Sequence, residues 1–145
     1  MTQIPTTLIN RHVQHGFTLL ELLVVIAIIG LLAGYVAPRY FSQIGKSEVG
    51  VARAQIDAFD KALDQYRLDT GRYPSTEQGL GALNTRPANE PKWLGPYLKK
   101  TVPLDPWGRA YVYKQPGDHA EYDLLSYGKD GALGGAGEAA DITNW

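Results

Sequence analysis

The sequence contains no cysteine among its 145 residues. This absence excludes disulfide bonds and a cysteine nucleophile, so a domain in an oxidising compartment would depend on packing or another staple. An excess of charge of one sign is also lacking, because 14 basic and 15 acidic residues leave a formal net charge of −1. Such a balance argues against a strongly electrostatic nucleic-acid binder.

Motifs that carry catalysis are missing as well. The sequence has no Gly-x-Ser-x-Gly nucleophile motif and no phosphate-binding loop. Its aspartates and glutamates are scattered and form no pair that the sequence alone can place together. We therefore expect the protein not to be an enzyme.

What the chain does have is one long apolar stretch. Residues 17–37 are apolar except for Thr18 and Glu21. In a helix, at about 1.5 Å per residue, this length spans the hydrocarbon core of a bilayer, which is about 30 Å thick. A segment that is apolar on every side is unsuited to the surface of a soluble domain. We predict a membrane-embedded helix over residues 17–37.

Glu21 is unusual in this setting, because a carboxylate inside a membrane helix is costly and usually has a partner. No lysine or arginine lies within two turns of it in the same helix. Cleavage between Gly16 and Phe17 would create an α-amino group that is charged near neutral pH. That amine could neutralise Glu21 of a neighbouring chain, and the carboxylate also suits the positive end of the helix dipole. Alternatively, Glu21 lies among the lipid headgroups and reaches water.

A family resemblance is carried by an apolar run that ends at Pro38 and is preceded by Gly16-Phe17-Thr18-Leu19-Leu20-Glu21. This pattern resembles the class III signal of type IV pilins and pseudopilins. The resemblance implies cleavage after Gly16 by a prepilin peptidase and N-methylation of Phe17. An ordinary secretory signal would instead lose its apolar core on cleavage. Residues 33–35 are the nearest site for such a cut and remain the alternative.

Beyond residue 38 the pattern becomes that of an amphipathic helix. Apolar residues recur at three- and four-residue steps between charged ones: Ile44, Val51, Ile56, Phe59, Leu63 and Tyr66. Asp69-Thr70-Gly71 is a helix stop. We predict one nearly continuous helix from Phe17 to about Thr70.

Gly30, Gly34 and Pro38 are helix breakers inside this segment. Pro38 removes a backbone hydrogen bond and its ring clashes with the carbonyl group of Gly34. The resemblance to pilin-like filaments implies that the Gly30–Pro38 segment unwinds on assembly. A simple kink is the alternative.

The remaining chain predicts short elements. A short helix is expected near residues 76–83, with Gln78 at capping-box spacing from Ser75. Strands are expected at residues 110–113 and 122–127. Four apolar residues are expected to pin the intervening loop to the core: Trp93, Leu94, Tyr97 and Leu98. His119 lies in a turn, where a solvated side chain is expected.

A closer resemblance rests on three further motifs, which are Tyr73-Pro74-Ser75-Thr76-Glu77-Gln78-Gly79-Leu80, Tyr97-Leu98-Lys99-Lys100 and Asp105-Pro106-Trp107-Gly108. With the N-terminal signal they resemble the G-type major pseudopilins of the type II secretion system over nearly the whole of Phe17 to Trp145. The resemblance implies an α+β, pilin-like fold. Its long N-terminal α-helix, transmembrane in the first half, packs on a small antiparallel β-sheet domain with a C-terminal calcium-binding loop.

The implied organisation has three parts. Residues 1–16 are a cleaved leader peptide, residues 17–37 are the transmembrane and filament-core helix, and residues 38–145 are the periplasmic pseudopilin domain.

The C-terminal segment 126–142 is rich in glycine and contains three acidic residues. Glycines let the backbone aim carbonyl groups inward and carboxylates add hard oxygen ligands, a combination that suits Ca²⁺. The spacing is not that of an EF-hand, and from the residues alone a flexible loop is the alternative. The resemblance implies one structural Ca²⁺, with Asp130 and Asp141 as side-chain ligands and the carbonyl groups of Tyr127 and Ala132 as further ligands.

This chain departs from the family pattern in having few acidic residues between Gly134 and Asp141. Glu138 stands there, flanked by glycine and alanine. Either Glu138 completes the ligand set or the affinity for calcium is lower.

The resemblance implies a structural subunit of the type II secretion pseudopilus, which polymerises in the periplasm to push folded exoproteins through the outer-membrane secretin. Gly16 would serve cleavage, Phe17 methylation and subunit pairing, and Glu21 assembly. The implied partners are further copies in a helical filament, minor pseudopilins, the inner-membrane assembly platform and prepilin peptidase, with secretin and exoproteins as indirect partners. No nucleic acid is expected. The chain would cross the inner membrane once, with its C-terminal domain in the periplasm.

Two other functions stay open. A type IV pilin for adhesion, motility or DNA uptake would share the architecture, but many such pilins carry a C-terminal disulfide loop, and this chain has no cysteine. A lone membrane-tethered periplasmic binding module would be a monomer insensitive to changes at Glu21.

Overall fold

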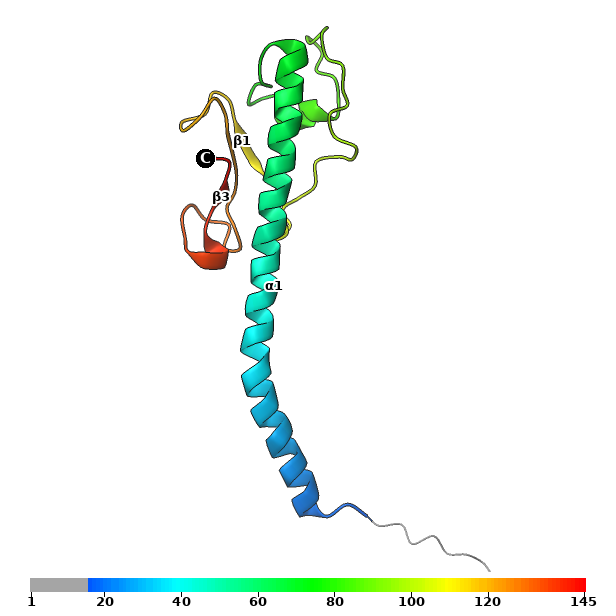
Figure 1. The fold of residues 1–145 in the computed structure, drawn as a ribbon, viewed down its shortest axis with the longest axis vertical. Helices are drawn as coiled ribbons and strands as arrows, with labels where there is room; N and C mark the ends of the chain where they lie inside the picture. The colour runs from blue at the N-terminus through cyan, green and yellow to red at the C-terminus, as the bar shows by residue number, and fades with distance from the viewer. Residues whose placement is uncertain (1–15) are drawn as a thin grey trace, which may run out of the picture. The chain divides into compact units, whose positions relative to one another are not determined.

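The computed structural model describes residues 16–145, and the predicted leader lies outside the described residues apart from Gly16. The chain forms two compact units, one ending at Tyr40 and one running from Phe41 to Trp145. In chain order the elements are α1 (Leu19–Thr70), η1 (Leu80–Leu83), β1 (Val112–Lys114), β2 (Asp123–Ser126), η2 (Gly137–Ala139) and β3 (Ile142–Thr143) (Figure 1).

The predicted long helix is confirmed, and α1 runs through Gly30, Gly34 and Pro38 without a break in its assigned α-helical structure. It ends where the sequence predicts, because Gly71 adopts a positive φ of 84° and its N–H donates to the carbonyl oxygen of Arg67 at 2.7 Å. Glycine reaches this left-handed conformation without the steric cost that a side chain would bring.

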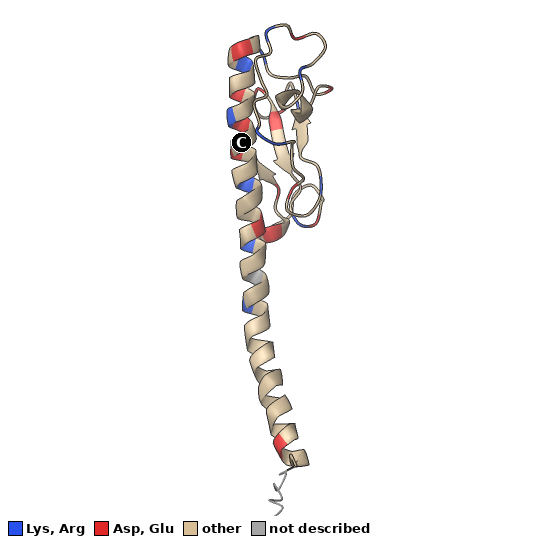
Figure 2. Cartoon of the chain, turned by 90° about the vertical axis from the view of Figure 1, so that its right-hand side faces the viewer, with Lys and Arg blue, Asp and Glu red and all other residues tan. Residues whose placement is uncertain are grey.

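The described part of the first unit, residues 16–40, contains no buried residue. Every described residue from Gly16 to Tyr40 is exposed, although most of these side chains are apolar. Figure 2 shows α1 in tan from its N-terminal end up to its first basic position, except for one acidic position near that end. An apolar helix exposed on all sides has to bury its surface in lipid or against other chains.

The second unit encloses a core built on one face of α1. Four members of the predicted apolar stripe are buried: Ile56, Phe59, Leu63 and Tyr66. The first two members, Ile44 and Val51, are exposed. The α1 face packs against residues of η1 and the sheet in one hydrophobic cluster, and Phe59 contacts Tyr111 edge-on with ring centroids 5.1 Å apart. Aromatic pairs in this arrangement add stability beyond the buried area alone.

A three-stranded antiparallel sheet in the order β1-β2-β3 completes this unit. Val112 pairs with Leu125, which in turn pairs with Thr143. The two predicted strands are confirmed with slightly different ends. The two residues of β3 were not predicted, because so short a strand shows no alternation of apolar and polar residues.

The helix expected near residues 76–83 is wrong in type and extent. Turns occupy its first half, and a 3₁₀-helix follows only over Leu80–Leu83. The capping-box pair is present, however. The backbone N–H of Ser75 donates to Gln78 Oε1 at 2.8 Å, and the N–H of Gln78 donates to Ser75 Oγ at 3.3 Å. The local signal was correct, although the segment that it starts is a turn.

Three of the four expected anchors of the intervening loop pack against the core. Trp93, Tyr97 and Leu98 are partly buried there, and Trp93 Nε1 donates to the carbonyl oxygen of Ala82 at 2.8 Å. Leu94 is an exception, since 76% of it is exposed. The loop is therefore held mainly by aromatic side chains.

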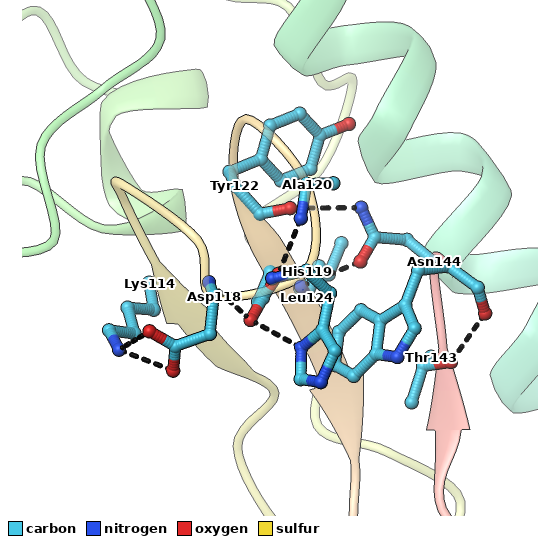
Figure 3. Close-up of polar contacts among 10 residues, drawn as sticks. Lys114, Asp118, His119, Ala120, Tyr122, Leu124, Thr143 and Asn144 are labelled. Atoms are coloured by element: carbon cyan, nitrogen blue, oxygen red, sulfur yellow. Dashed lines mark hydrogen bonds and ion pairs between the residues drawn. The ribbon is translucent and has the colours of Figure 1, made fainter.

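His119 lies in a bend and is exposed, as expected, but its side chain also has partners that the sequence did not predict. Although its side chain is half exposed, its Nδ1 lies 2.9 Å from Asp123 Oδ2 and its ring stacks on that of Trp145, with centroids 4.2 Å apart (Figure 3). Asn144 adds a hydrogen bond from the N–H of Leu124 to its Oδ1 at 2.9 Å. The C-terminal residues are thus fixed to the β1–β2 hairpin.

Asp123 is the buried centre of this arrangement. Burial alone would raise its pKa, but the His119 side chain and the backbone N–H groups of Asp118, His119 and Ala120 outweigh that effect and lower the pKa to about 2. The carboxylate therefore stays ionised and closes the hairpin turn.

Candidate functional site

Residues 16–18 of the N-terminal signal have no regular secondary structure and lead directly into α1. Phe17 is exposed, and Thr18 caps the helix together with Glu21. The Glu21 N–H donates to Thr18 Oγ1 at 3.1 Å, while the Thr18 N–H and hydroxyl group both donate to Glu21 Oε2 at 3.0 Å. This reciprocal capping box orients the carboxylate toward the helix N-terminus.

Thr18 is a functional residue that the reasoning from sequence missed. Its signal was available, because a threonine followed three residues later by glutamate and an apolar run is the sequence pattern of a capping box. Glu21 therefore has partners within its own helix, which neither the headgroup nor the intersubunit interpretation had included. Both interpretations stay open.

The helix that follows is long and apolar enough to cross a membrane. Within residues 17–38, Glu21 is the only charged residue. Unwinding of the Gly30–Pro38 segment on assembly stays a prediction, since the helix is continuous in this single chain.

The second candidate site is the C-terminal loop, residues 127–141. Asp130 turns back on its own loop, with its Oδ1 accepting a hydrogen bond from the Ala132 N–H at 3.1 Å. Asp141 pairs with Gly134 in both directions. Its Oδ2 accepts from the Gly134 N–H at 2.9 Å, and its own N–H donates to the Gly134 carbonyl oxygen at 3.2 Å. These bonds close the second half of the loop.

The two halves of the loop also touch. The N–H of Lys129 donates to the carbonyl oxygen of Glu138 at 3.0 Å. Gly128 is buried with a φ of 63°, and a Cβ there would lie 2.6 Å from the carbonyl oxygen of Ala140. Only glycine allows this approach of the two backbones.

The Glu138 carboxylate is paired with a lysine. Its Oε2 accepts from Lys129 Nζ at 2.8 Å, and this contact raises the pKa of Lys129. The Glu138 carboxylate also lies against Gly45 of α1, where a Cβ would come within 1.9 Å of it. Across residues 16–145, no three His, Cys, Asp or Glu side chains gather into a metal-binding group.

The turn at Asp105-Pro106-Trp107-Gly108 is hydrogen-bonded to the end of β2, directly before the loop. The buried Asp105 carboxylate accepts from the N–H of Trp107 at 3.1 Å, the N–H of Arg109 at 2.7 Å and the hydroxyl group of Ser126 at 2.7 Å. The sequence predicted the turn but not this role of Asp105. Its partner Ser126, the last residue of β2, lies 21 positions later in the sequence, so no local pattern predicts the contact.

The donor set is compatible with Ca²⁺. Asp141 Oδ1 is buried and has no hydrogen-bond partner among the described residues. In that part of the chain, no donor bonds the carbonyl oxygens of Tyr127 or Ala132 either. Unpaired oxygens of this kind are the ligands that Ca²⁺ takes, and a buried oxygen without a partner is unfavourable. Asp130 is exposed and accessible to an ion.

Comparison with known proteins decides the family. Residues 39–145 match the family described as "Type II secretion system (T2SS), protein G", and residues 11–37 match the "Prokaryotic N-terminal methylation motif". The chain belongs to the type II secretion system protein G family. This membership confirms the resemblance read from the N-terminal signal and the three downstream motifs.

Among its relatives are proteins named "Type II secretion system core protein G". The one from Pseudomonas aeruginosa is 46% identical over 140 residues, which cover 94% of this chain and 98% of the relative. The one from Vibrio cholerae is 47% identical over 135 residues, which cover 91% and 92%.

A solved structure shows the same fold. It is the major pseudopilin from the type 2 secretion system of enterohaemorrhagic Escherichia coli, 37% identical, with a TM-score of 0.60 over 72% of this chain and 92% of that one. The pilin-like α+β fold is therefore confirmed. As a member of this family the chain is a structural subunit of the pseudopilus, anchored by its apolar N-terminal helix.

Proposed function

We propose that the chain polymerises through residues 17–38 into a helical pseudopilus in the periplasm, where it pushes folded exoproteins toward the outer-membrane secretin. The observation that carries this proposal is the complete exposure of an apolar helix in the first unit. Heterologous contacts between such helices repeat from copy to copy and generate an open filament.

Processing prepares this helix for assembly. Cleavage after Gly16 and methylation of Phe17 leave a positively charged amine near the start of α1. The amine of one subunit then neutralises Glu21 of the next. The capping box supports this role, because Thr18 already holds the Glu21 carboxylate at the helix N-terminus in the single chain.

The same proposal places the chain in the bacterial inner membrane with a single crossing and its second unit in the periplasm. Prepilin peptidase processes it there, and the inner-membrane assembly platform and minor pseudopilins start the filament. Secretin and exoproteins are met only through the assembled filament. No residue is assigned a catalytic role.

We also propose one structural Ca²⁺ in the loop of residues 127–141. Asp130 and Asp141 would hold it with the carbonyl groups of Tyr127 and Ala132. The ion would be the positively charged partner of these oxygens. The unpaired Asp141 Oδ1 supports this assignment. Glu138 would join the ligand set only by leaving Lys129.

The assembly proposal is tested by expressing the chain with prepilin peptidase and counting filaments. We expect Glu21→Ala to reduce filament number at least about tenfold, since an unpaired amine would remain in an apolar contact. Glu77→Ala, which removes an exposed carboxylate in the second unit, is the matched control and should leave filaments unchanged. Equal filament numbers for Glu21→Ala and the native chain would remove the ion-pair argument.

Mass spectrometry of the membrane-extracted protein tests processing separately. The native polypeptide should begin at Phe17 and carry one methyl group. A start at any other residue would contradict the filament assignment.

A further inference from the structure

Arg109 lies against the first half of the C-terminal loop, although it belongs to the turn that precedes β1. Its Nη1 donates to the carbonyl oxygen of Gly128 at 2.7 Å, and its Nη2 donates to that of Lys129 at 3.1 Å. The guanidinium group also lies against Gly131, where a Cβ would come within 2.6 Å of it. One planar cation therefore spans residues 128–131.

The backbone of Arg109 is held independently of its side chain. Its N–H donates to the buried Asp105 carboxylate at 2.7 Å, and its carbonyl oxygen accepts from the Asp105 N–H at 2.7 Å. Asp105 also accepts a hydrogen bond from the Ser126 hydroxyl group. The backbone of Arg109 is therefore linked through Asp105 to β2, the strand that leads into the loop. The side chain starts from a rigid support, so that little freedom is lost when it binds the two carbonyl groups.

In the second half of the loop, residues 133–141, no described arginine is seen to bridge two backbone carbonyl groups in this way. This half is closed by the Gly134–Asp141 pair, and the buried Asp141 Oδ1 has no partner among the described residues. Residues 133–137 are all exposed. The Lys129 side chain is paired with Glu138, and Lys46 of α1 lines a pocket together with Gly137 and Glu138.

We propose that Arg109 is the built-in cation of the first half of the loop, residues 127–132, and makes the order of this half independent of calcium. Its guanidinium group binds two successive carbonyl groups that a chain without it would leave to water or to an ion. This gives a physical reason why a loop with few acidic residues can stay folded. The statement about calcium rests on the metal site proposed above.

Hydrogen exchange of the full chain in detergent micelles tests this proposal, with mass-spectrometric readout of residues 127–132 and 133–141 in calcium and in chelator. In the native chain, chelator should speed exchange of residues 133–141 and of the Lys129 N–H, which donates to the carbonyl oxygen of Glu138, and should leave the rest of residues 127–132 unchanged. In Arg109→Gln, residues 127–132 should exchange about tenfold faster in chelator, and calcium should restore part of the protection. Arg109→Lys should resemble Arg109→Gln, because an ammonium group cannot bind both carbonyl groups in one plane.

Arg86→Gln is the matched control, since Arg86 also donates to two backbone carbonyl groups, those of Glu90 and Pro91, at 3.0 and 3.1 Å. It should leave both loop segments unchanged. The proposal would be overturned if residues 127–132 of Arg109→Gln stayed protected from exchange in chelator. It would also be overturned if chelator removed the protection of both halves of the loop in the native chain. If calcium changes nothing in any variant while Arg109→Gln still exposes residues 127–132, the calcium site fails and the role of Arg109 stands.

Discussion

The two units of the chain use the same kinds of apolar residue in opposite ways. In the first unit, up to Tyr40, leucine, isoleucine and valine side chains are exposed along the whole helix. In the second unit, Ile56 and Leu63 of α1 are buried against η1 and the sheet, although Ile44 and Val51 stay exposed. The apolar helix of the first unit needs lipid or another protein surface to bury it, whereas the second unit carries its own core.

The polar groups of the first unit make local contacts, whereas those of the second unit hold separate segments together. Between Phe17 and Pro38 the first unit has a single charged residue, Glu21, and its carboxylate is held by the neighbouring Thr18. The second unit uses buried carboxylates, Asp105 and Asp123, to fix turns that lie far apart in the sequence. Satisfied buried polar groups of this kind specify one arrangement of the loops.

The largest expected effect is the difference in stability between replacing a buried leucine of the second unit and an exposed leucine of the first. Leu63→Ala removes a fully buried side chain and should destabilise the second unit by about 2–5 kcal/mol, the cost of a core cavity. Leu23→Ala, in the exposed first unit, should leave the unfolding of the second unit unchanged. Chemical denaturation in micelles, followed by tryptophan fluorescence, measures both. Similar losses for the two variants would contradict the division into a self-supporting and a dependent unit.

Calcium removal should have the next largest effect. A ligand at about a hundred times its Kd stabilises a fold by about 2.7 kcal/mol, so chelation should lower the Tm of the second unit by several degrees. Asp130→Ala should mimic chelation and abolish the response to calcium. Thermal scans of the full chain with calcium and with chelator test this. Equal Tm values in the two conditions would remove the metal site.

The pH dependence should come from Asp123. Its pKa of about 2 lies below the ordinary value of 3.8, so its ionised form stabilises the fold above about pH 4, and this contribution is lost as the pH falls toward 2. Asp123→Asn should lower stability at neutral pH and flatten the acid limb of the profile. Asp118→Asn, an exposed neighbour, is the control. An acid limb that is unchanged in Asp123→Asn would assign the acid sensitivity to other groups.

The smallest expected effect compares two glycines of α1. Gly50→Ala meets open space and should stabilise the helix by about 1 kcal/mol through better helix propensity. Gly45→Ala should gain less, because its methyl group must push the Glu138 carboxylate away from Lys129, an exposed pair worth about 0–1 kcal/mol. Denaturation midpoints of the two variants give the difference. A gain at Gly45 that equals or exceeds the gain at Gly50 would show that Glu138 moves without cost.

Local signals were reliable where one segment contains the whole cause. The apolar run with Glu21 predicted the start of α1, and Gly71 predicted the end of α1. Ser75 with Gln78 predicted a capping pair. Each depends on residues within a few positions of one another. The signal sequence also resembled its family closely enough to predict the function, since the leader junction and Glu21 lie in a single stretch.

Neighbouring residues are enough to predict the long helix, its apolar character and the glycine-rich loop, because periodicity, apolarity and turn residues are local properties of a chain. Only the tertiary structure decided that Arg109 supports that loop, that Asp105 binds Ser126 and that Trp145 covers His119. These pairs join residues that the fold of the second unit brings together across long separations. No local pattern encodes such contacts, because they depend on how the helix, turn and sheet pack around one core.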